Sequence, residues 1–261
     1  MSQRALDTLE RVSLIAAEDT RHTAMLTRHF GITTPLVAYH DHNEQEATEQ
    51  LINRLQGGES VALVSDAGTP LISDPGYRLV RGAHDCGVEV IPLPGPCAAI
   101  VALSASGLPT DSFHFAGFLP AKSTPRRARL TELAAYSATI VLYEAPHRIV
   151  STLKDALEAF GGAREAVLVR ELTKTYETIR RASLEDLVSW VEGDQNQQKG
   201  EQVLLIAPAP RASKEGVTDR ERQLLKRLAE ELPPRKAAAL GAELTGHKAR
   251  YLYDLLLEEE Q

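Results

Sequence analysis

Two carboxylates in a glycine- and proline-rich segment are the first residues of this sequence that could do chemistry. Asp66 and Asp74 lie in Ser65–Gly76, directly after the apolar run Val61–Val64. Glycine lets a loop backbone approach a ligand closely, and carboxylates could accept hydrogen bonds from ribose hydroxyls or an amino group. The alternative is an ordinary turn whose aspartates cap a helix near Tyr77. For Asp74 alone that turn is the better interpretation, whereas the whole loop favours a ligand site.

A second turn of similar composition follows the apolar run Val88–Ile91. It reads Pro92-Leu-Pro-Gly-Pro-Cys-Ala98. Prolines stiffen it, Gly95 permits a tight passage into the next helix, and small residues from Cys97 onward leave room for a flat ring. A plain helix start with proline in its first turn is the alternative. Because ligands of open parallel sheets bind beyond the carboxyl ends of the strands, two such loops indicate one shared site.

Alternating strands and helices must position these loops. Near-continuous apolar runs are typical of parallel strands buried on both faces. In the first part of the chain we predict strands at Val12–Ala17, Leu36–Ala38, Val61–Ser65 and Val88–Pro92, and helices at Gln45–Leu55, Tyr77–Asp85 and Ala98–Ala105. Strands and helices that alternate through short links indicate right-handed βαβ units. A parallel sheet should therefore occupy this part of the chain.

The second half contains another set of strands, followed by a helical tail. We predict strands at Phe113–Phe118, Thr139–Tyr143, Ala166–Arg170, Thr175–Arg181 and Gln202–Ala207, and helices at Pro146–Phe160 and Leu184–Val191. Too few residues separate the third and fourth of these strands for a helical crossover, so this sheet should be mixed. The sequence thus predicts an α/β protein with an N-terminal α/β domain (1–110), a mixed α/β domain (111–209) and a C-terminal helical domain (210–261).

Composition narrows the function classes. The chain has 261 residues, a net charge of −7 and two cysteines, Cys86 and Cys97, without metal-ligand spacing. This favours a reducing cytoplasm and argues against a zinc site. No apolar run is long enough for a membrane span, and the absence of a GxxxxGK[ST] loop disfavours nucleotide hydrolysis. The acidic total does not favour nucleic acid, but the segment 121–130 is locally basic, through Lys122, Arg126, Arg127 and Arg129. A solvated surface loop explains that segment equally well.

Longer motifs resemble one family. They are Leu63–Pro70, Pro92–Ala99, Ala17–Thr23, His40–Glu44, Leu142–Arg148 and Arg170–Glu177. Together they resemble the tetrapyrrole-methylase superfamily and, within it, bacterial enzymes that methylate a cytidine ribose 2′-oxygen in 16S rRNA. The resemblance covers nearly the whole chain from Gln3, and many motifs in one order are more specific than any one. It implies a homodimer without metal that binds S-adenosyl-L-methionine between two α/β domains and acts on 16S rRNA or the assembled small ribosomal subunit.

The resemblance also assigns residues to the cofactor. Carried over position by position, the cofactor-binding residues are Asp66, Gly68, Thr69, Pro94, Gly95, Pro96, Cys97, Ala98, Tyr143, Arg170, Glu171 and Thr173. The second-domain residues among them would close the site. Tyr143 could instead be a core aromatic at a strand end.

Methyl transfer to a hydroxyl requires a group that accepts a proton. Glu18 and Asp19 follow the strand that ends at Ala17, and we take them with His42 as catalytic candidates; His22 and His40 lie in comparable places. A histidine in a polar loop is more often an ordinary surface residue.

Several basic residues could contact RNA. Arg21 and Arg148 could hold phosphate, since guanidinium groups bind phosphate oxygens in a fixed fork. The segment 233–250 resembles a helix-turn-helix with Lys248 and Arg250 early in its second helix. Docking or dimer packing explains this tail equally well.

The resemblance has one departure at the start of the chain. The family opens with a strand and a Pro/Gly-rich turn ahead of the Gln3–Glu10 helix, whereas this chain begins at Met1. Either the start is assigned downstream of the true one, or the protein has lost the first parallel strand. In the second case we expect an exposed sheet position and a gap in the active site. Two alternatives follow: a ribosome-binding module without catalysis, and a methylase of a tetrapyrrole or another small molecule.

Overall fold

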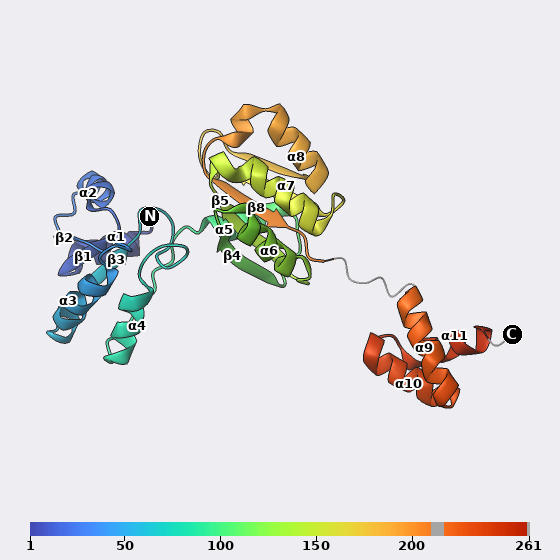
Figure 1. Cartoon of the computed structure of the whole chain (residues 1–261). Helices are drawn as coiled ribbons and strands as arrows, with labels where there is room; N and C mark the ends of the chain where they lie inside the picture. The colour runs from blue at the N-terminus through green and yellow to red at the C-terminus, as the bar shows by residue number, and fades with distance from the viewer. Residues whose placement is uncertain (210–216, 260–261) are drawn as a thin grey trace. The chain divides into compact units, whose positions relative to one another are not determined.

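The computed structural model describes residues 1–209 and 217–259. The chain divides into two compact units, Met1–Pro208 and Ala209–Gln261, and each is described by itself (Figure 1). None of the helices described is long and apolar enough to cross a membrane.

The first unit opens with a parallel sheet. Its strands are β1 (Leu14–Ala17), β2 (Leu36–Ala38) and β3 (Val61–Val64), in the order β2-β1-β3. Both pairings are parallel, as predicted. The helices of this region are α1 (Gln3–Arg11), α2 (Thr20–His29), α3 (Glu44–Gln56) and α4 (Tyr77–Asp85). Apolar side chains from β1, α3 and α4, with Tyr39, form its core.

The predicted strand Val88–Pro92 is wrong. This segment has no strand assignment, and in the described residues β3 is the last strand on its side of the sheet. An apolar, β-branched run favours extended backbone, but a strand forms only where a neighbour supplies hydrogen-bond partners. The sequence pattern reveals the preference for an extended backbone but not whether a neighbouring strand is present.

The second sheet is mixed, as predicted. It contains β4 (Phe113–Phe118), β5 (Thr139–Glu144), β6 (Glu165–Arg170), β7 (Thr178–Ser183) and β8 (Gln202–Ile206). The order is β4-β5-β8-β6-β7, in which β4 and β5 are parallel and the other pairs antiparallel. On one face pack the helices α6 (Ser123–Ala134), α7 (Ile149–Phe160) and α8 (Leu184–Gly193). The short helices η1 (Pro146–Arg148) and η2 (Gln195–Gln198) complete this region.

Helix α5 (Ala98–Ser106) covers the opposite face of the second sheet. Its buried residues Ala99, Ala102 and Leu103 form a cluster with side chains of β5, β6 and β8. The sequence placed this helix in the N-terminal domain, but its apolar side is buried against the second sheet. The turn Pro92–Ala98 therefore leads directly from the first region onto the second. The predicted domain limits stay a prediction.

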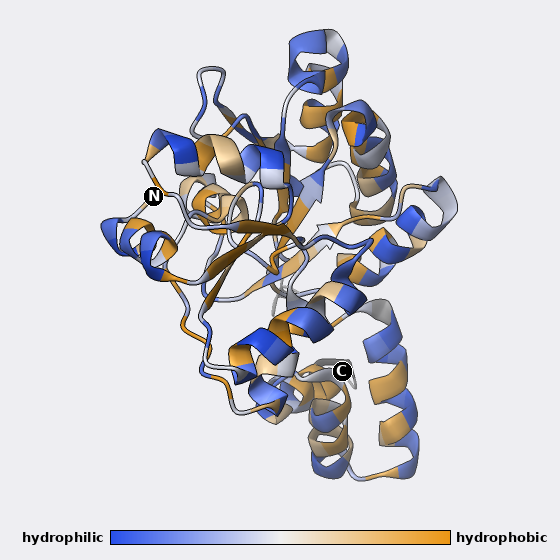
Figure 2. Ribbon diagram, turned by 90° about the vertical axis from the view of Figure 1, so that its left-hand side faces the viewer, coloured by the Kyte–Doolittle hydropathy of each residue, from blue (hydrophilic) through white to orange (hydrophobic). Residues whose placement is uncertain are grey.

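The second unit is helical. It contains α9 (Asp219–Glu231), α10 (Pro234–Thr245) and α11 (Ala249–Glu259), which bury a small apolar core that includes Leu225 and Leu252. In Figure 2 apolar and polar residues alternate along these helices, as expected where one side of each is buried. Gly246 adopts a left-handed backbone, with φ of 74°, and ends α10. The predicted helix, glycine turn and helix are thus present.

Candidate active site

The loop Ser65–Gly76 lies beyond the carboxyl ends of β1 and β3 and is joined to both. The parallel register pairs Ala17 with Val64, so the residues that follow these two strands are neighbours. The Asp66 N–H donates to a Glu18 carboxylate oxygen at 3.0 Å, and the Asp19 N–H donates to Asp66 Oδ1 at 3.0 Å. This reciprocal pair fixes the start of the loop against the start of α2.

Asp19 begins helix α2 and is held by Arg21. Its Oδ1 accepts the Arg21 backbone N–H at 2.7 Å, and its two oxygens bind the Arg21 guanidinium at distances down to 2.6 Å. These hydrogen bonds hold the pKa of the Asp19 carboxyl well below its usual range. Asp19 therefore stays ionised and paired, and is unsuited to take up a proton. The structure argues against the predicted catalytic role and gives Asp19 the role of a helix cap.

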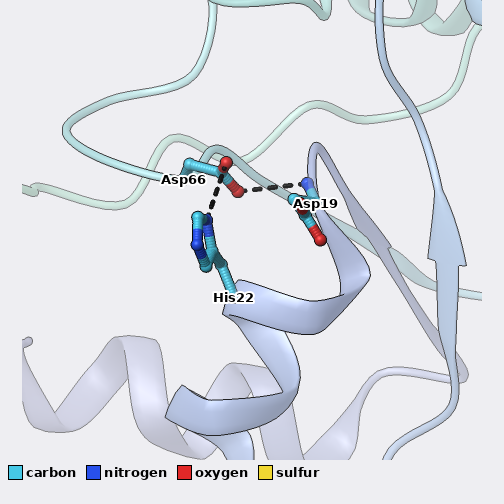
Figure 3. A group of neighbouring side chains, drawn as sticks. All are labelled: Asp19, His22 and Asp66. Atoms are coloured by element: carbon cyan, nitrogen blue, oxygen red, sulfur yellow. Dashed lines mark hydrogen bonds and ion pairs between the residues drawn. The ribbon is translucent and has the colours of Figure 1, made fainter.

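One turn into α2, His22 points at the loop. Its Nδ1 lies 3.1 Å from Asp66 Oδ2, and the side chain is 60% exposed (Figure 3). Both oxygens of Asp66 thus have partners within the protein. Asp19, His22 and Asp66 also place one potential metal-ligand atom each within 4.8 Å of the others. Arg21 already occupies the Asp19 carboxylate, so a cation would have to displace a guanidinium at 2.6 Å.

The backbone of the loop is held in an unusual conformation. Leu71 and Ser73 have φ values of 72° and 67°, each of which costs about 1–3 kcal/mol for a residue other than glycine. Gly76 has φ of 137°, and a Cβ there would lie 2.6 Å from Leu63. Such a conformation persists only where the surroundings dictate it, and it recurs at Glu171 and Thr173 in the predicted closing segment.

The two loops predicted from sequence meet. The Thr69 hydroxyl donates to the Pro96 carbonyl at 2.9 Å, and a Cβ on Gly68 would lie 3.7 Å from the same oxygen. At the start of α5 the Ala99 N–H donates to the Tyr143 hydroxyl at 3.1 Å. The structure therefore brings together three parts of the predicted cofactor set: the loop after β3, the turn before α5 and the end of β5.

The Tyr143 side chain lies among aromatic rings and near the carboxylate of Asp74. Phe115 and Phe118 contact it edge-on, with ring centroids 4.9 and 5.6 Å away. Burial raises the pKa of Tyr143 to about 12, and the charge of Asp74 adds to the shift. The phenol is therefore neutral near pH 7 and serves as an acceptor at the start of α5, rather than as a core aromatic alone.

Carboxylates crowd this region. Burial raises the pKa of Asp74, and repulsion from Glu18, Asp66 and Asp41 adds to the shift. A ligand with positive charge relieves such repulsion. Small residues at the start of α5 and the ribose-binding capacity of carboxylates suit a nucleoside. The residues present thus fit S-adenosyl-L-methionine, which carries a sulfonium, an ammonium and a ribose.

The predicted closing segment after β6 is bonded within itself and to the residues next to it in the second sheet. Glu171 accepts the Glu201 N–H at 2.8 Å and pairs with Lys174, and the Thr173 N–H donates to Glu177 at 2.6 Å. Arg170 donates to Thr178. Across residues 1–209, no hydrogen bond connects this segment to Ser65–Gly76. Its cofactor role stays a prediction.

His42 lies near the far end of the loop, since Glu44, two residues further on, accepts the Gly76 N–H at 3.3 Å. It is exposed at the start of α3 beside the His40 ring, whose centroid is 5.9 Å away, and it lines an open acidic hollow that includes Glu44 and Arg78. In the described chain His42 makes no hydrogen bond to the loop. The catalytic role of His42 stays a prediction.

The basic segment is a helix, and its arginines are largely paired. Arg126 in α6 is only 5% exposed and binds the buried Asp155 at 2.7 Å. This burial and pairing argue against the predicted RNA contact of Arg126, because the guanidinium would have to leave Asp155 to bind a phosphate. Arg127 pairs with Glu158 and Arg129 with Glu132, while Lys122 is exposed. The charge run in the sequence could not reveal these partners.

Arg148 also has a structural partner set. It donates to the Leu119 carbonyl at 2.7 Å and pairs with the buried Glu144 at 3.1 Å. Its predicted phosphate contact would compete with these bonds. Arg21, by contrast, is 87% exposed although its guanidinium pairs with Asp19.

Comparison with known proteins gives the family. The family model described as Tetrapyrrole (Corrin/Porphyrin) Methylases matches residues 1–188. The chain belongs to the tetrapyrrole methylase family. A second model, the RsmI C-terminal HTH domain, matches residues 215–260. This methylase is therefore an S-adenosyl-L-methionine-dependent methyltransferase, and the predicted fold, enzyme class and cofactor are confirmed.

Similar proteins span nearly the whole methylase. The "Ribosomal RNA small subunit methyltransferase I" of Vibrio cholerae is 54% identical over 258 residues, which cover 99% of this chain and 90% of that protein. The protein of the same name from Pseudomonas aeruginosa is 53% identical, with coverages of 100% and 93%. Solved structures are more distant. Uroporphyrin-III-C-methyltransferase from Thermus thermophilus has a TM-score of 0.55 at 22% identity, covering 79% of this chain and 87% of that one. The methyltransferase CobJ has a TM-score of 0.59 at 18% identity, with coverages of 82% and 91%. These two support the fold alone.

The sequence analysis does not predict the contact between His22 and Asp66. It treats His22 as one histidine among several and assigns Asp66 to the cofactor alone. A signal was available: Asp19 and His22 are three residues apart, which places them on one turn of a helix that starts at the sheet edge. The parallel pairing of β1 with β3 then puts Asp66 beside both.

Proposed function

We propose that this methylase transfers a methyl group from S-adenosyl-L-methionine to the ribose 2′-oxygen of a cytidine in 16S rRNA. The observation that carries the proposal is identity above 50%, over nearly the full length, to proteins named for methylation of small-subunit ribosomal RNA. The helical second unit, which matches the C-terminal domain model of such a protein, supports the same substrate.

The cofactor supplies an activated methyl group on a sulfonium. The chain must hold that group in line with the acceptor oxygen. Gly68, Thr69 and the turn Pro94–Ala98 offer backbone groups at the joined loops, and Tyr143 fixes the first turn of α5. The carboxylates around Asp74 favour the positive charge of the donor.

RNA binding requires basic groups away from this acidic region. We assign it to Lys122 on the first unit and to Lys248 and Arg250 on the second, all of which are exposed. Lys248 directly precedes α11 and Arg250 is in its first turn, as expected for the second helix of a helix-turn-helix. The acting form is proposed to be a homodimer, in the cytoplasm with the ribosomal subunits.

A small-molecule methylase is the second candidate, since uroporphyrin-III-C-methyltransferase shares the fold. Its identity of 22% is far below the values for the proteins named for ribosomal RNA. A helical second unit is also unnecessary for a small acceptor. RNA is therefore the better substrate class.

The test combines the protein, labelled S-adenosyl-L-methionine and small ribosomal subunits that lack the modification. We expect label in 16S rRNA, at the 2′-oxygen of one cytidine, and none in uroporphyrinogen III. Free 16S rRNA in a parallel reaction distinguishes naked RNA from the assembled subunit. Binding of S-adenosyl-L-methionine without any transfer would support a non-catalytic module and refute the proposal.

A further inference from the structure

We propose that His22, oriented by Asp66, is the base that accepts the 2′-hydroxyl proton during methyl transfer. This inference rests on the proposed function. It begins from the contact between His22 Nδ1 and Asp66 Oδ2, at 3.1 Å (Figure 3). A carboxylate can only accept a hydrogen bond, so in the neutral ring Nδ1 carries the hydrogen and Nε2 keeps a free lone pair.

The free nitrogen is accessible. Across the described residues Nε2 of His22 has no hydrogen-bond partner, and the side chain is 60% exposed. Asp66 is itself fixed, because its Oδ1 accepts the Asp19 N–H and its N–H donates to Glu18. The ring is thus aimed by a carboxylate that belongs to the loop proposed to bind the cofactor.

Asp19 and Glu18 already accept hydrogen bonds within the protein. Asp19 is bound through both oxygens by Arg21, and its pKa is held low. Glu18 accepts the Asp66 N–H and so positions the loop. His42 lies at the start of α3 without a bond to the loop. His22 is the histidine joined to it.

The step balances in atoms and charge. The 2′-oxygen forms a bond to the methyl carbon, and the carbon–sulfur bond breaks with its electron pair going to sulfur. The sulfonium becomes a neutral thioether, and the proton of the hydroxyl moves to His22 Nε2. The resulting imidazolium faces Asp66, with Asp19 and Arg21 the other charged groups beside it. Its exposure lets the proton leave to water.

The first experiment measures rate and affinity separately. In His22→Ala we expect single-turnover methyl transfer at saturating cofactor and subunit to fall about 100-fold or more, since general bases contribute 10²–10⁴-fold. Affinities for S-adenosyl-L-methionine, by calorimetry, and for the small subunit should change less than about twofold, because the ring is not assigned to either. Added imidazole should restore part of the rate. His29→Ala, an exposed histidine of the same helix, is the matched control and should keep the wild-type rate.

Three outcomes would overturn the base assignment while the proposed function stands: an unchanged rate in His22→Ala, a loss of cofactor affinity that accounts for the loss of rate, and no response to imidazole. Saturable zinc binding that His22→Ala abolishes would also overturn it, since the group would then be a metal site. If the wild-type protein transfers no methyl group to subunits, the proposed function itself fails.

A second readout needs no activity. Nitrogen-15 NMR of the histidine rings should show His22 as the tautomer protonated at Nδ1 in the wild-type protein. In Asp66→Asn that preference should weaken, because the amide presents both an acceptor and donors. A wild-type His22 protonated at Nε2 would refute the dyad, whatever the enzyme's substrate proves to be.

Discussion

The Thr69 hydroxyl donates a hydrogen bond to the Pro96 carbonyl at 2.9 Å. Twenty-seven positions separate the two residues, and each lies in one of the two Gly/Pro-rich segments that the sequence singles out. The bond fixes the distance between a loop that follows β3 and a turn that starts α5. If the cofactor binds where these loops meet, the bond organises its site before binding.

Thr69→Val tests this organisation, because it keeps the shape of the side chain and removes the donor. A hydrogen bond of this kind contributes about 1 kcal/mol, so we expect cofactor affinity to fall about fivefold in calorimetry, with little change in the thermal midpoint. Thr124→Val, at an exposed threonine of α6, should leave the affinity unchanged. Equal affinities in all three proteins would show that the two loops need no such link.

We expect the Tyr143 hydroxyl to stabilise the folded first unit through its hydrogen bond with the Ala99 N–H, and the ring to pack against its aromatic neighbours. Tyr143→Phe retains the contacts with Phe115 and Phe118 but leaves the Ala99 N–H without its acceptor. Loss of a partner to a buried donor costs about 1–3 kcal/mol. Urea unfolding of the first unit should shift by that amount and cofactor affinity should fall. Tyr136→Phe is the control, since Tyr136 is 37% exposed and contacts only a ring, that of His114, in the interactions described; a shift there as large would contradict the assignment.

Local sequence patterns predict the secondary structure of this protein better than the contacts between distant residues. Apolar runs located most strands of both sheets, and the short link between β6 and β7 indicated their antiparallel pairing. Val88–Pro92 shows the limit, because strand formation depends on a neighbour that local pattern cannot report. The same holds at the site. Carboxylates in a loop could be named, but the contact of His22 with Asp66 depends on the β1–β3 register, which places the loop beside α2. In the sequence Arg126 is one of several basic residues in a charge run, and only the structure shows that it pairs with the buried Asp155.

Arg126 should therefore act on stability and not on RNA. Both members of its pair are nearly buried, with side-chain exposures of 6% for Arg126 and 10% for Asp155. Removing one partner leaves an uncompensated buried charge, which costs about 3–5 kcal/mol. Arg126→Met should lower the unfolding free energy by this amount, and replacing Asp155 by Leu in the same protein should recover much of it. Arg127→Met, at an exposed neighbour paired with Glu158, should change stability little. A stable Arg126→Met protein with weakened subunit binding would contradict the buried role.

We expect the charge of Asp74 to lower the stability of the folded protein and to raise its affinity for the cofactor. Its folded pKa is raised by burial first and by neighbouring carboxylates. The sign follows from linkage: a carboxyl with a raised folded pKa binds its proton more tightly when folded, so it costs stability above that pKa, and the cost fades as pH falls toward the unfolded value of 3.8. Asp74→Asn should thus be more stable than wild type at pH 7, with a gain that shrinks at lower pH. Cofactor affinity should fall, because a negative charge beside a cationic ligand is lost. Denaturant curves at several pH values and calorimetry at pH 7 measure the two effects.

Lys248 should bind RNA without touching the cofactor. It is exposed just before α11, where a helix-turn-helix presents its second helix. Lys248→Glu replaces attraction to a phosphate by repulsion, so we expect weaker binding of small subunits, a shallower dependence of affinity on salt, and unchanged affinity for S-adenosyl-L-methionine. Lys236→Glu, the same charge change at an exposed position in the first turn of α10, separates a local contact from a general effect of charge. If both variants weaken binding equally, the second unit attracts RNA through its overall field; if neither does, its function is docking or dimer packing.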